Sequence, residues 1–233
     1  MMRITAVLGL FLLCLPLPLS AMMVKSGTGF FISKAGHIIT NEHVVRGCKS
    51  VKIRGAVAPT HAEVIKTDNE IDLALLRTKT IPPRIAPIRS ARDEIRIGEK
   101  LLVIGYPKKH GQTGISKLTH SKVKGLKGPL GGDQWVQFED SARQGNSGGP
   151  LLDSSGNVIG VVMGKAEIIR TNLANGRQEN IGKSDLAISL PYLWDFIEGE
   201  QVHTVTLNSA LQHGNGYLER MASEYIVNIH CLD

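Results

Sequence analysis

The sequence predicts an all-β protein, because short strands recur at regular spacing, glycine-rich turns separate them, and a helical pattern appears only late in the chain. Such spacing is typical of a β-barrel or a β-sandwich. A hydrophobic share of 42% and a charged share of 21% are those of an ordinary globular protein. We therefore expect one large β domain or two small ones after the N-terminal segment.

The strands can be assigned in order from their apolar or alternating runs. The first two flank the Lys34-Ala35-Gly36 turn and predict a hairpin. Pro191 is expected to begin a helix that ends before Gly199, and residues 207–223 are expected to be helical around a Gly-Asn-Gly interruption. The expected strands are residues 29–33, 36–40, 51–53, 62–66, 73–77, 101–105, 115–123, 135–138, 151–152, 158–163, 186–190 and 225–229.

The N-terminus has the pattern of a secretory signal peptide. Arg3 precedes an apolar run over residues 6–19, and small residues, Ser20 and Ala21, follow it. We expect residues 1–21 to be cleaved and the protein, residues 22–233, to be exported to the periplasm or secreted, without stable membrane insertion afterwards. A retained anchor is the alternative, although the run is short for a membrane span.

Charge and histidine content point to no cofactor and no nucleic acid partner. The net charge is +6. No aromatic residues are interleaved with the lysines between residues 108 and 127, so a solvated basic loop explains them better than nucleic-acid binding does. Four histidines have no cysteine or carboxylate partners at metal-ligand spacing. We interpret them as surface or turn residues without a metal: His37, His61, His110 and His120.

The strongest local motif is GNSGGP at residues 145–150. A serine hydroxyl needs a base to take its proton and donors to stabilise an oxyanion. Glycines around Ser147 let the amides of Gly145 and Ser147 converge on one point. The alternative is a glycine-rich turn with an incidental serine.

Two upstream segments supply the partners that such a serine needs. His43 follows an apolar strand, and Asp72 precedes another. A base is oriented by a carboxylate on its far imidazole nitrogen. Each residue alone is usually structural, but the ordered triple His43, Asp72 and Ser147 predicts a catalytic triad.

These motifs resemble the bacterial trypsin-like peptidases, and most of all the protease domain of the HtrA (Deg) family. The similarity runs from Gly27 to about Ile197. It is carried by residues 27–32 (GTGFFI), 40–45 (TNEHVV), 72–76 (DLALL), 104–107 (IGYP) with Gly98, 145–152 (GNSGGPLL) and 158–161 (VIGV).

The resemblance implies a chymotrypsin-like fold of two six-stranded β-barrels, with a C-terminal helix and an extra C-terminal tail. The barrels would occupy residues 24–112 and 113–198, and the tail residues 199–233. It also implies a serine endopeptidase that cleaves protein or peptide substrates through an acyl-enzyme on Ser147, with His43 as general base, Asp72 as its orienter, and the amides of Gly145 and Ser147 as the oxyanion hole. The family's peptide-binding PDZ domains are not expected.

Alternatives remain at this point. Asn146 replaces the aspartate with which digestive trypsins bind a new N-terminus, so activation by cleavage is not expected. A pseudopeptidase that only binds peptides is the runner-up. An α/β-hydrolase also has a G-x-S-x-G motif, but it needs a helix after the serine. The sequence indicates no oligomeric state.

By alignment with the family, Ser141 lies at the base of the S1 subsite, and Met163, Gly164 and Lys165 pair with the substrate backbone. Because Ser141 is not a carboxylate, we expect an uncharged P1 residue, although Asp185 is near enough in the pattern to leave this open.

Cysteine content predicts one disulfide. Cys14 leaves with the signal, and Cys48 and Cys231 form an even pair in an exported protein. If residues 225–229 are a strand, they need a sheet edge, and the barrel near Cys48 offers one. Two free thiols, or an intermolecular bond through Cys231, are the alternatives.

Overall fold

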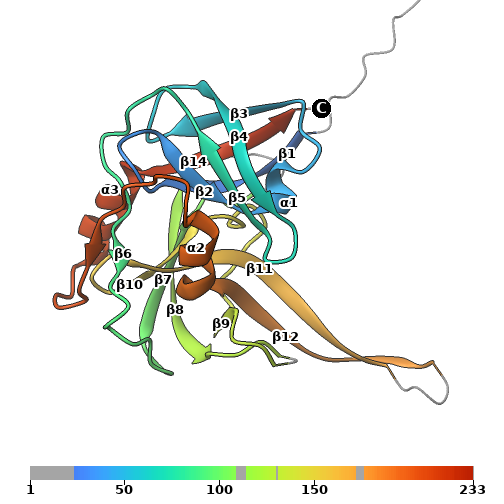
Figure 1. Cartoon of the computed structure of the whole chain (residues 1–233). Coiled ribbons are helices and arrows are strands. Elements are labelled where there is room, and N and C mark those ends of the chain that lie inside the picture. Colours follow the sequence, from blue (N-terminus) through green and yellow to red (C-terminus); the bar gives the residue numbers. More distant parts are fainter. Residues whose placement is uncertain (1–23, 109–113, 130, 172–175, 233) are drawn as a thin grey trace, which may run out of the picture.

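A computed structural model describes residues 24–108, 114–129, 131–171 and 176–232, which form two β-barrels and three helices (Figure 1). The expected signal peptide and His110 lie outside the described residues. The predicted double-barrel, chymotrypsin-like fold is confirmed.

The first barrel is closed in the order β1-β14-β3-β4-β5-β2. The expected hairpin is formed by β1 and β2, which pair Phe30 with Ile39 and Phe31 with Ile38. All four side chains are fully buried, so this hairpin supplies much of the barrel core. The strands are β1 (Val24–Phe31), β2 (His37–Thr40), β3 (Ser50–Gly55), β4 (Thr60–Asp68), β5 (Leu73–Arg77) and β14 (Ile226–Leu232).

The sixth strand of this barrel comes from the end of the chain. β14 lies antiparallel between β1 and β3, with Gly29 opposite Val227 and Ile53 opposite Ile229. Both β14 side chains are fully buried. The segment that the sequence analysis sets apart as a tail is therefore part of the first barrel, because only β14 closes the gap between β1 and β3.

The second barrel comprises six strands in the order β7-β8-β9-β12-β11-β10, closed by pairing of β10 with β11. Along β7 the side chains alternate. Leu101 and Val103 face the core of this barrel, whereas Leu102 and Ile104 join the larger apolar cluster outside it. The strands are β7 (Lys100–Gly105), β8 (Lys117–Gly125), β9 (Trp135–Phe138), β10 (Pro150–Asp153), β11 (Val158–Thr171) and β12 (Gln178–Ser189).

β11 and β12 are much longer than their apolar runs predict. They remain paired as far as Thr171 opposite Gln178 and project from the barrel as a long hairpin (Figure 1). The outer half contains charged residues such as Glu167 and Lys183, which form an ion pair at 2.9 Å. In the sequence, charged and polar residues interrupt the few apolar ones here, so the extension has no regular alternating pattern that would predict a strand.

The helices confirm one expectation and correct another. α2 (Leu190–Ile197) begins with Pro191 in its first turn, as predicted. The helix predicted over residues 207–223 is wrong in its first half, because α3 (Asn215–Ser223) begins directly after Gly214. Gly-Asn-Gly therefore starts a helix and does not interrupt one. Before it, the short strand β13 (Thr206–Leu207) pairs with β6 (Ile88–Arg89).

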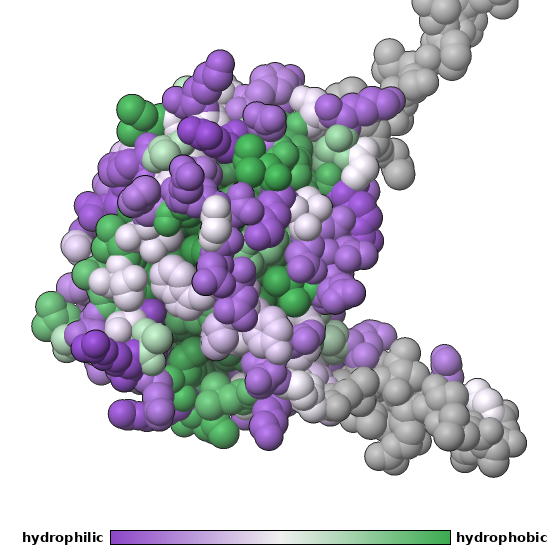
Figure 2. Space-filling view, viewed as in Figure 1, coloured by the Kyte–Doolittle hydropathy of each residue, from purple (hydrophilic) through white to green (hydrophobic). Residues whose placement is uncertain are grey.

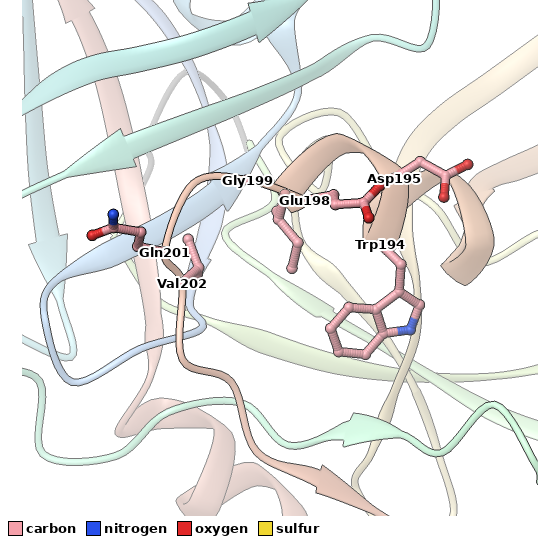
Figure 3. Close-up of a pocket in the computed structure, with 7 residues that line it drawn as sticks. Trp194, Asp195, Glu198, Gly199, Gln201 and Val202 are labelled. Atoms are coloured by element: carbon pink, nitrogen blue, oxygen red, sulfur yellow. The ribbon is translucent and has the colours of Figure 1, made fainter.

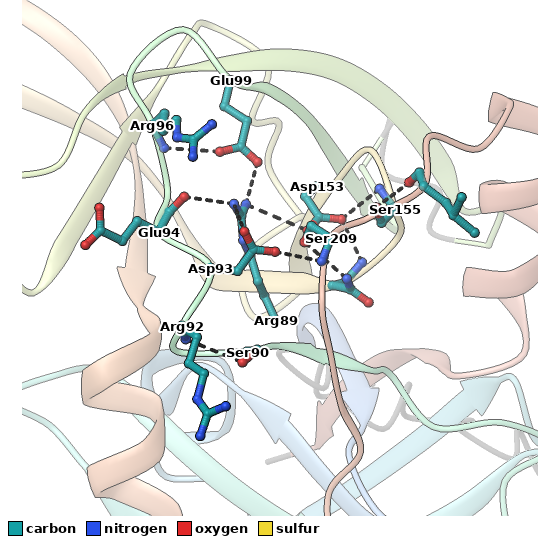
Figure 4. Close-up of polar contacts among 12 residues, drawn as sticks. Arg89, Ser90, Arg92, Asp93, Glu94, Arg96, Glu99, Asp153, Ser155 and Ser209 are labelled. Atoms are coloured by element: carbon teal, nitrogen blue, oxygen red, sulfur yellow. Dashed lines mark hydrogen bonds and ion pairs between the residues drawn. The ribbon is translucent and has the colours of Figure 1, made fainter.

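A buried arginine ties the segment before α3 to the second barrel (Figure 4). The side chain of Arg89 is only 5% exposed and bonds to Glu99, with Asp93 at 3.6 Å and Asp153 at 3.8 Å. Ser209 donates its backbone N–H to Asp93 at 2.7 Å and its hydroxyl to Asp153. This network fixes the path by which the chain returns to the first barrel.

The surface is mainly hydrophilic on the face in Figure 2, with hydrophobic residues gathered in its lower part. An apolar hollow of about 480 Å³ lies between β9, α2 and the segment after β6, lined by side chains that include Trp135, Leu190 and Trp194. None of the predicted catalytic residues lines it.

Candidate active site

His43 lies on the one-turn helix α1 (Glu42–Val45), directly after β2. Its Nδ1 is 2.7 Å from Oδ2 of Asp72, and its backbone N–H donates to Oδ1 of the same carboxylate at 3.0 Å. A carboxylate can only accept a hydrogen bond, so Nδ1 is the ring nitrogen that carries the hydrogen. In the neutral imidazole, Nε2 is then the acceptor. The carboxylate thus fixes both the position and the tautomer of the imidazole.

Asp72 is itself held in an unusual backbone conformation. Its φ is +59°, in the left-handed region that few residues other than glycine, asparagine and aspartate adopt. Its carbonyl accepts hydrogen bonds from Nδ2 of Asn41 at 2.8 Å and from the backbone N–H of Glu42 at 3.2 Å. Asn41 and Glu42 therefore hold the backbone of Asp72, whose carboxylate orients His43.

Ser147 lies in the loop before β10, between strands of both barrels. Its carbonyl accepts from the N–H of Thr28 in β1 at 2.9 Å. On the other side, a Cβ placed on Gly164 of β11 would lie 3.6 Å from the Ser147 hydroxyl oxygen. The serine thus lies where β1 of the first barrel meets β11 of the second.

Two glycines let the histidine and serine loops approach each other. A Cβ on Gly27 would lie 2.9 Å from the carbonyl of Ser147 and 2.7 Å from Cγ2 of Val44, the neighbour of His43. A Cβ on Gly148, whose φ is +81°, would lie 2.2 Å from Oγ1 of Thr40. Side chains at these positions would force the two loops apart.

The loop before Ser147 leaves two amides free at one place. The Gln144 carbonyl accepts from the N–H of Lys108 at 2.7 Å, and in a trans peptide the Gly145 N–H points the opposite way. Gly145 has φ +99°. In the described part of the chain, the amides of Gly145 and Ser147 donate no hydrogen bond, whereas that of Asn146 donates to Arg143 at 2.9 Å.

Thr28 fixes the other end of this loop. Its hydroxyl donates to the carbonyl of Gly145 at 2.7 Å and accepts from the N–H of Tyr106 at 2.9 Å. Thr28 is fully buried. A single hydroxyl of the first barrel therefore holds two loops of the second barrel in register.

The predicted substrate-pairing residues lie on an open strand edge. β11 pairs with β10 as far as Val161, and the N–H of Val162 still donates to Gly149 at 2.8 Å. Beyond this point the described pairings of β11 are with β12 alone, so the other edge of Met163, Gly164 and Lys165 is available to an extended peptide.

Ser141 differs from expectation in its surroundings. Its backbone N–H donates to Oδ2 of Asp185 at 2.7 Å, and the N–H of Ala142 donates to the same oxygen at 2.6 Å. Asp185, which the sequence left open as a neighbour of this position, therefore places a carboxylate against the backbone of Ser141. The pairing of β12 with β11 brings Asp185 back to residue 141 across 44 positions of sequence.

The structure joins Cys48 and Cys231 in a disulfide, with Cα atoms 5.2 Å apart. Cys48 follows α1, and Cys231 lies in β14 opposite Val51 of β3. The bond thus connects the helix that carries His43 to the C-terminal strand.

The histidines outside the triad occupy different surroundings. His37 is not at the surface as expected but buried in β2, where its Nδ1 bonds to the Ser33 hydroxyl at 2.7 Å. Burial, with a smaller contribution from Arg77, lowers the pKa of His37. Among the described residues no group of three or more His, Cys, Asp or Glu side chains is placed to hold a metal ion.

Two residues of this region, Thr28 and Asn41, were not singled out by their roles in the sequence analysis, and Asp185 was named there only as near the predicted S1 position. Thr28 and Asn41 stand in the quoted motifs GTGFFI and TNEHVV, which contain their signal. Asp185 stands in no motif, and only strand pairing reveals its contact with Ser141.

A hollow at the end of α2 is separate from the predicted site. It has a volume of about 600 Å³, is lined by Trp194, Ile197 and Val202 with acidic neighbours, and contains none of the predicted catalytic residues (Figure 3). No helix in the described ranges is long and apolar enough to cross a membrane. The α/β-hydrolase alternative is wrong, because a strand, β10, follows Ser147.

Comparison with known proteins agrees with this geometry. The family model of the trypsin-like peptidase domain matches residues 27–161. An uncharacterised protein, y4bJ of Sinorhizobium fredii, is 35% identical over 210 residues, which is 89% of this chain and 32% of y4bJ. A probable periplasmic DegP-like serine endoprotease of Brucella suis is 31% identical over 63% of this chain and 29% of its own length.

Solved structures show the same likeness. The active form of the Rv3671c protease from Mycobacterium tuberculosis has a TM-score of 0.57 and 25% identity, over 77% of this chain and 75% of that one. The chain spans about a third of the length of the curated relatives named above. The match to the family model over more than half of its residues shows that this chain belongs to the trypsin-like peptidase domain family, with HtrA/DegP-like serine proteases among its relatives.

Proposed function

We propose that this protein is an exported serine endopeptidase that cleaves peptide bonds through an acyl-enzyme on Ser147. The observation that carries the proposal is the pair of bonds from one Asp72 carboxylate to His43, which leave Nε2 of the imidazole free on a helix next to the Ser147 loop. An oriented neutral imidazole beside a serine is the arrangement that activates a hydroxyl nucleophile.

In acylation, His43 takes the proton of the Ser147 hydroxyl while its oxygen bonds to the substrate carbonyl carbon. The carbonyl π-electrons move onto its oxygen and form a tetrahedral oxyanion. As this collapses, His43 passes the proton to the leaving nitrogen and the C–N bond breaks. A water molecule, deprotonated by the same imidazole, then releases the acyl group from Ser147.

The oxyanion would be stabilised by the N–H groups of Gly145 and Ser147. Support comes from their lack of partners in the described chain, from the fixed Gln144–Gly145 peptide and from the Thr28 bond to Gly145. Donors held in place before the charge develops need no reorganisation during the reaction. Loss of one such donor costs a factor of about 10²–10³ in kcat in related chemistry.

The substrate would bind as an added strand. The open edge of Met163, Gly164 and Lys165 offers backbone donors and acceptors to an extended chain next to Ser147. Because this recognition uses main-chain groups along the strand, it suits internal segments of unfolded proteins or peptides. We therefore assign endopeptidase activity, which cleaves bonds inside a chain and requires no free terminus of the substrate.

Export is supported by the N-terminal signal pattern, by the Cys48–Cys231 bond and by the similarity to a DegP-like relative that is named as a probable periplasmic protease. Disulfides persist in oxidising compartments such as the periplasm. The periplasm or the medium is thus the proposed location.

The test is hydrolysis of an unfolded protein, such as reduced casein, by the purified exported chain. The wild type should release internal fragments, and Ser147→Ala should abolish release while its melting temperature stays the same. Fragment release by the Ser147→Ala variant at the wild-type rate would refute the assignment. A wild type that binds casein but never cleaves it would favour the pseudopeptidase.

A further inference from the structure

Asp185 presents a buried carboxylate that has no countercharge among the described residues. The residue is 3% exposed, and its two hydrogen bonds, from the N–H groups of Ser141 and Ala142, both go to Oδ2. In the described part of the chain no lysine, arginine or histidine nitrogen forms an ion pair with it, and no bond to Oδ1 is found. A buried charge of this kind is costly unless a partner compensates it.

Two cations, one close to Asp185 in strand register and one close to Ser141 in sequence, form ion pairs with another residue. Lys165 lies directly opposite Asp185 across β11 and β12, but its ammonium pairs with Asp140. Arg143 also reaches Asp140, at 3.5 Å. The side chain of Asp140 is 76% exposed, so both of these ion pairs lie at the surface. Neither cation pairs with the buried carboxylate of Asp185.

The position of Asp185 relative to Ser147 is set by strand register. Gly164, whose Cβ position is 3.6 Å from the Ser147 hydroxyl oxygen, pairs with Leu186, the residue after Asp185. Ser141, which bonds to Asp185 from the other side, precedes Ser147 by six residues. The carboxylate therefore lies between β11, which carries the substrate-pairing residues, and the loop over residues 139–149 that contains Ser147.

Ser141 contributes a second unpartnered group. It is 2% exposed, and its hydroxyl oxygen is buried without any hydrogen-bond partner. A buried hydroxyl without a partner is unfavourable, because it has given up its hydrogen bonds to water and gained none in return. A ligand with several N–H donors would satisfy the Ser141 hydroxyl and neutralise Asp185 at once.

We propose that Asp185 determines the P1 specificity of the enzyme and selects a basic side chain, lysine or arginine. This rests on the proposed endopeptidase function and replaces the uncharged P1 residue that the sequence alone suggests. The P1 ammonium or guanidinium supplies the missing countercharge and the donors for Oδ1 and the Ser141 hydroxyl. Aliphatic P1 side chains leave both groups desolvated and unpaired.

A purely structural role for Asp185 makes a different prediction. If the carboxylate only holds the N–H groups of Ser141 and Ala142, an asparagine amide oxygen can accept the same bonds. Asp185→Asn would then change kcat/KM by the same factor for every substrate, or for none. The charge matters selectively only if a cation of the substrate binds there.

The experiment compares kcat/KM for peptides that differ only at P1, with Lys, Arg, Ala or Leu. The wild type should prefer Lys and Arg, and Asp185→Asn should reduce kcat/KM for these two by roughly 10- to 100-fold while changing Ala and Leu by less than about threefold. Glu139→Gln, which removes an exposed carboxylate two residues from Ser141, is the matched control and should leave the ratio unchanged.

A fluorophosphonate probe, which reacts with the nucleophile and needs no P1 side chain, separates the two levels of the proposal. The role of Asp185 is overturned if the wild type takes the label but prefers Ala or Leu at P1. It is also overturned if Asp185→Asn lowers kcat/KM equally for all four substrates. In both cases the endopeptidase function stands. If the wild type neither takes the label nor cleaves any peptide, the endopeptidase function itself is overturned.

Discussion

The hydroxyl of Thr28 donates a hydrogen bond to the carbonyl of Gly145 at 2.7 Å, across 117 positions of sequence and from one barrel to the other. The same oxygen accepts from Tyr106. The peptide that would form the oxyanion hole is thus held by a side chain of the first barrel, so we expect catalysis to depend on this buried hydroxyl.

Thr28→Val should lower kcat/KM by roughly 10- to 100-fold, because small displacements of catalytic groups have effects of this size. The variant keeps the shape of the side chain but leaves the Gly145 carbonyl and the Tyr106 N–H without partners. Steady-state kinetics on one peptide measures the effect. Thr28→Ser, which keeps the hydroxyl, should stay within a few fold of the wild type, and equal losses in both variants would contradict the hydrogen-bond role.

The Cys48–Cys231 bond should stabilise the fold strongly. It closes a loop of 183 positions, for which the chain-entropy model gives up to about 5 kcal/mol. Urea unfolding of the Cys48→Ala/Cys231→Ala double variant should show a lower unfolding free energy, and reductant should lower that of the wild type only. An unfolding curve of the wild type that reductant leaves unchanged would contradict an intramolecular bond.

The Arg89 network predicts a second stability effect (Figure 4). Arg89→Met should lower the unfolding free energy by roughly 3–5 kcal/mol, because it leaves buried Asp153 and its acidic neighbours without their countercharge. Denaturant unfolding measures the loss. Arg92→Met, on an exposed arginine of the same segment, is the control, and similar values for both variants would show that the network contributes little.

One buried histidine, His37, and one half-buried histidine, His230, should make stability depend on pH. Burial lowers the pKa of His37 and that of His230, where Arg54 and Lys108 add to the effect. The unfolded chain then binds protons at a higher pH than the folded chain. Stability is complete above the ordinary histidine pKa of about 6.5 and falls as the pH drops toward the lowered values.

Unfolding free energies measured between pH 5 and pH 8 should therefore rise with pH, with a slope of at most one proton per histidine. The His37→Gln/His230→Gln double variant should have a flatter profile in this range. His61→Gln, on an exposed histidine, should leave the slope unchanged. A wild-type slope that survives in the double variant would assign the pH dependence to other groups.

How much of this structure the sequence could predict depends on how far apart in the chain the interacting residues lie. The residues around His43, Asp72 and Ser147 stand in local motifs, and glycines at fixed positions mark the close approaches, so the barrels and the candidate triad were predictable. The strand that closes the first barrel was only partly predictable. The alternating residues 225–229 indicated a strand, but the closure of the barrel by β14 depends on pairing with β1 and β3 across almost the whole chain.

Asp185 illustrates the same limit at the site. Its sequence neighbours give no motif, and its contact with Ser141 depends on the register of β11 and β12, which shifts between Val162 and Gly164. A one-residue difference in that register would turn the side chain to the opposite face. Sequence reasoning therefore named Ser147 as the candidate nucleophile from its motif, but for Asp185 it gave only a place near Ser141 and not the contact between them.

The most direct test of the triad is covalent labelling of the purified protein with a fluorophosphonate, followed by peptide mapping. We predict a single adduct on Ser147, absent in Ser147→Ala and formed much more slowly in His43→Ala, because the probe reacts only with an activated hydroxyl. A wild type without an adduct on Ser147, or one labelled as fast in His43→Ala, would contradict the assignment of His43 and Ser147 as base and nucleophile.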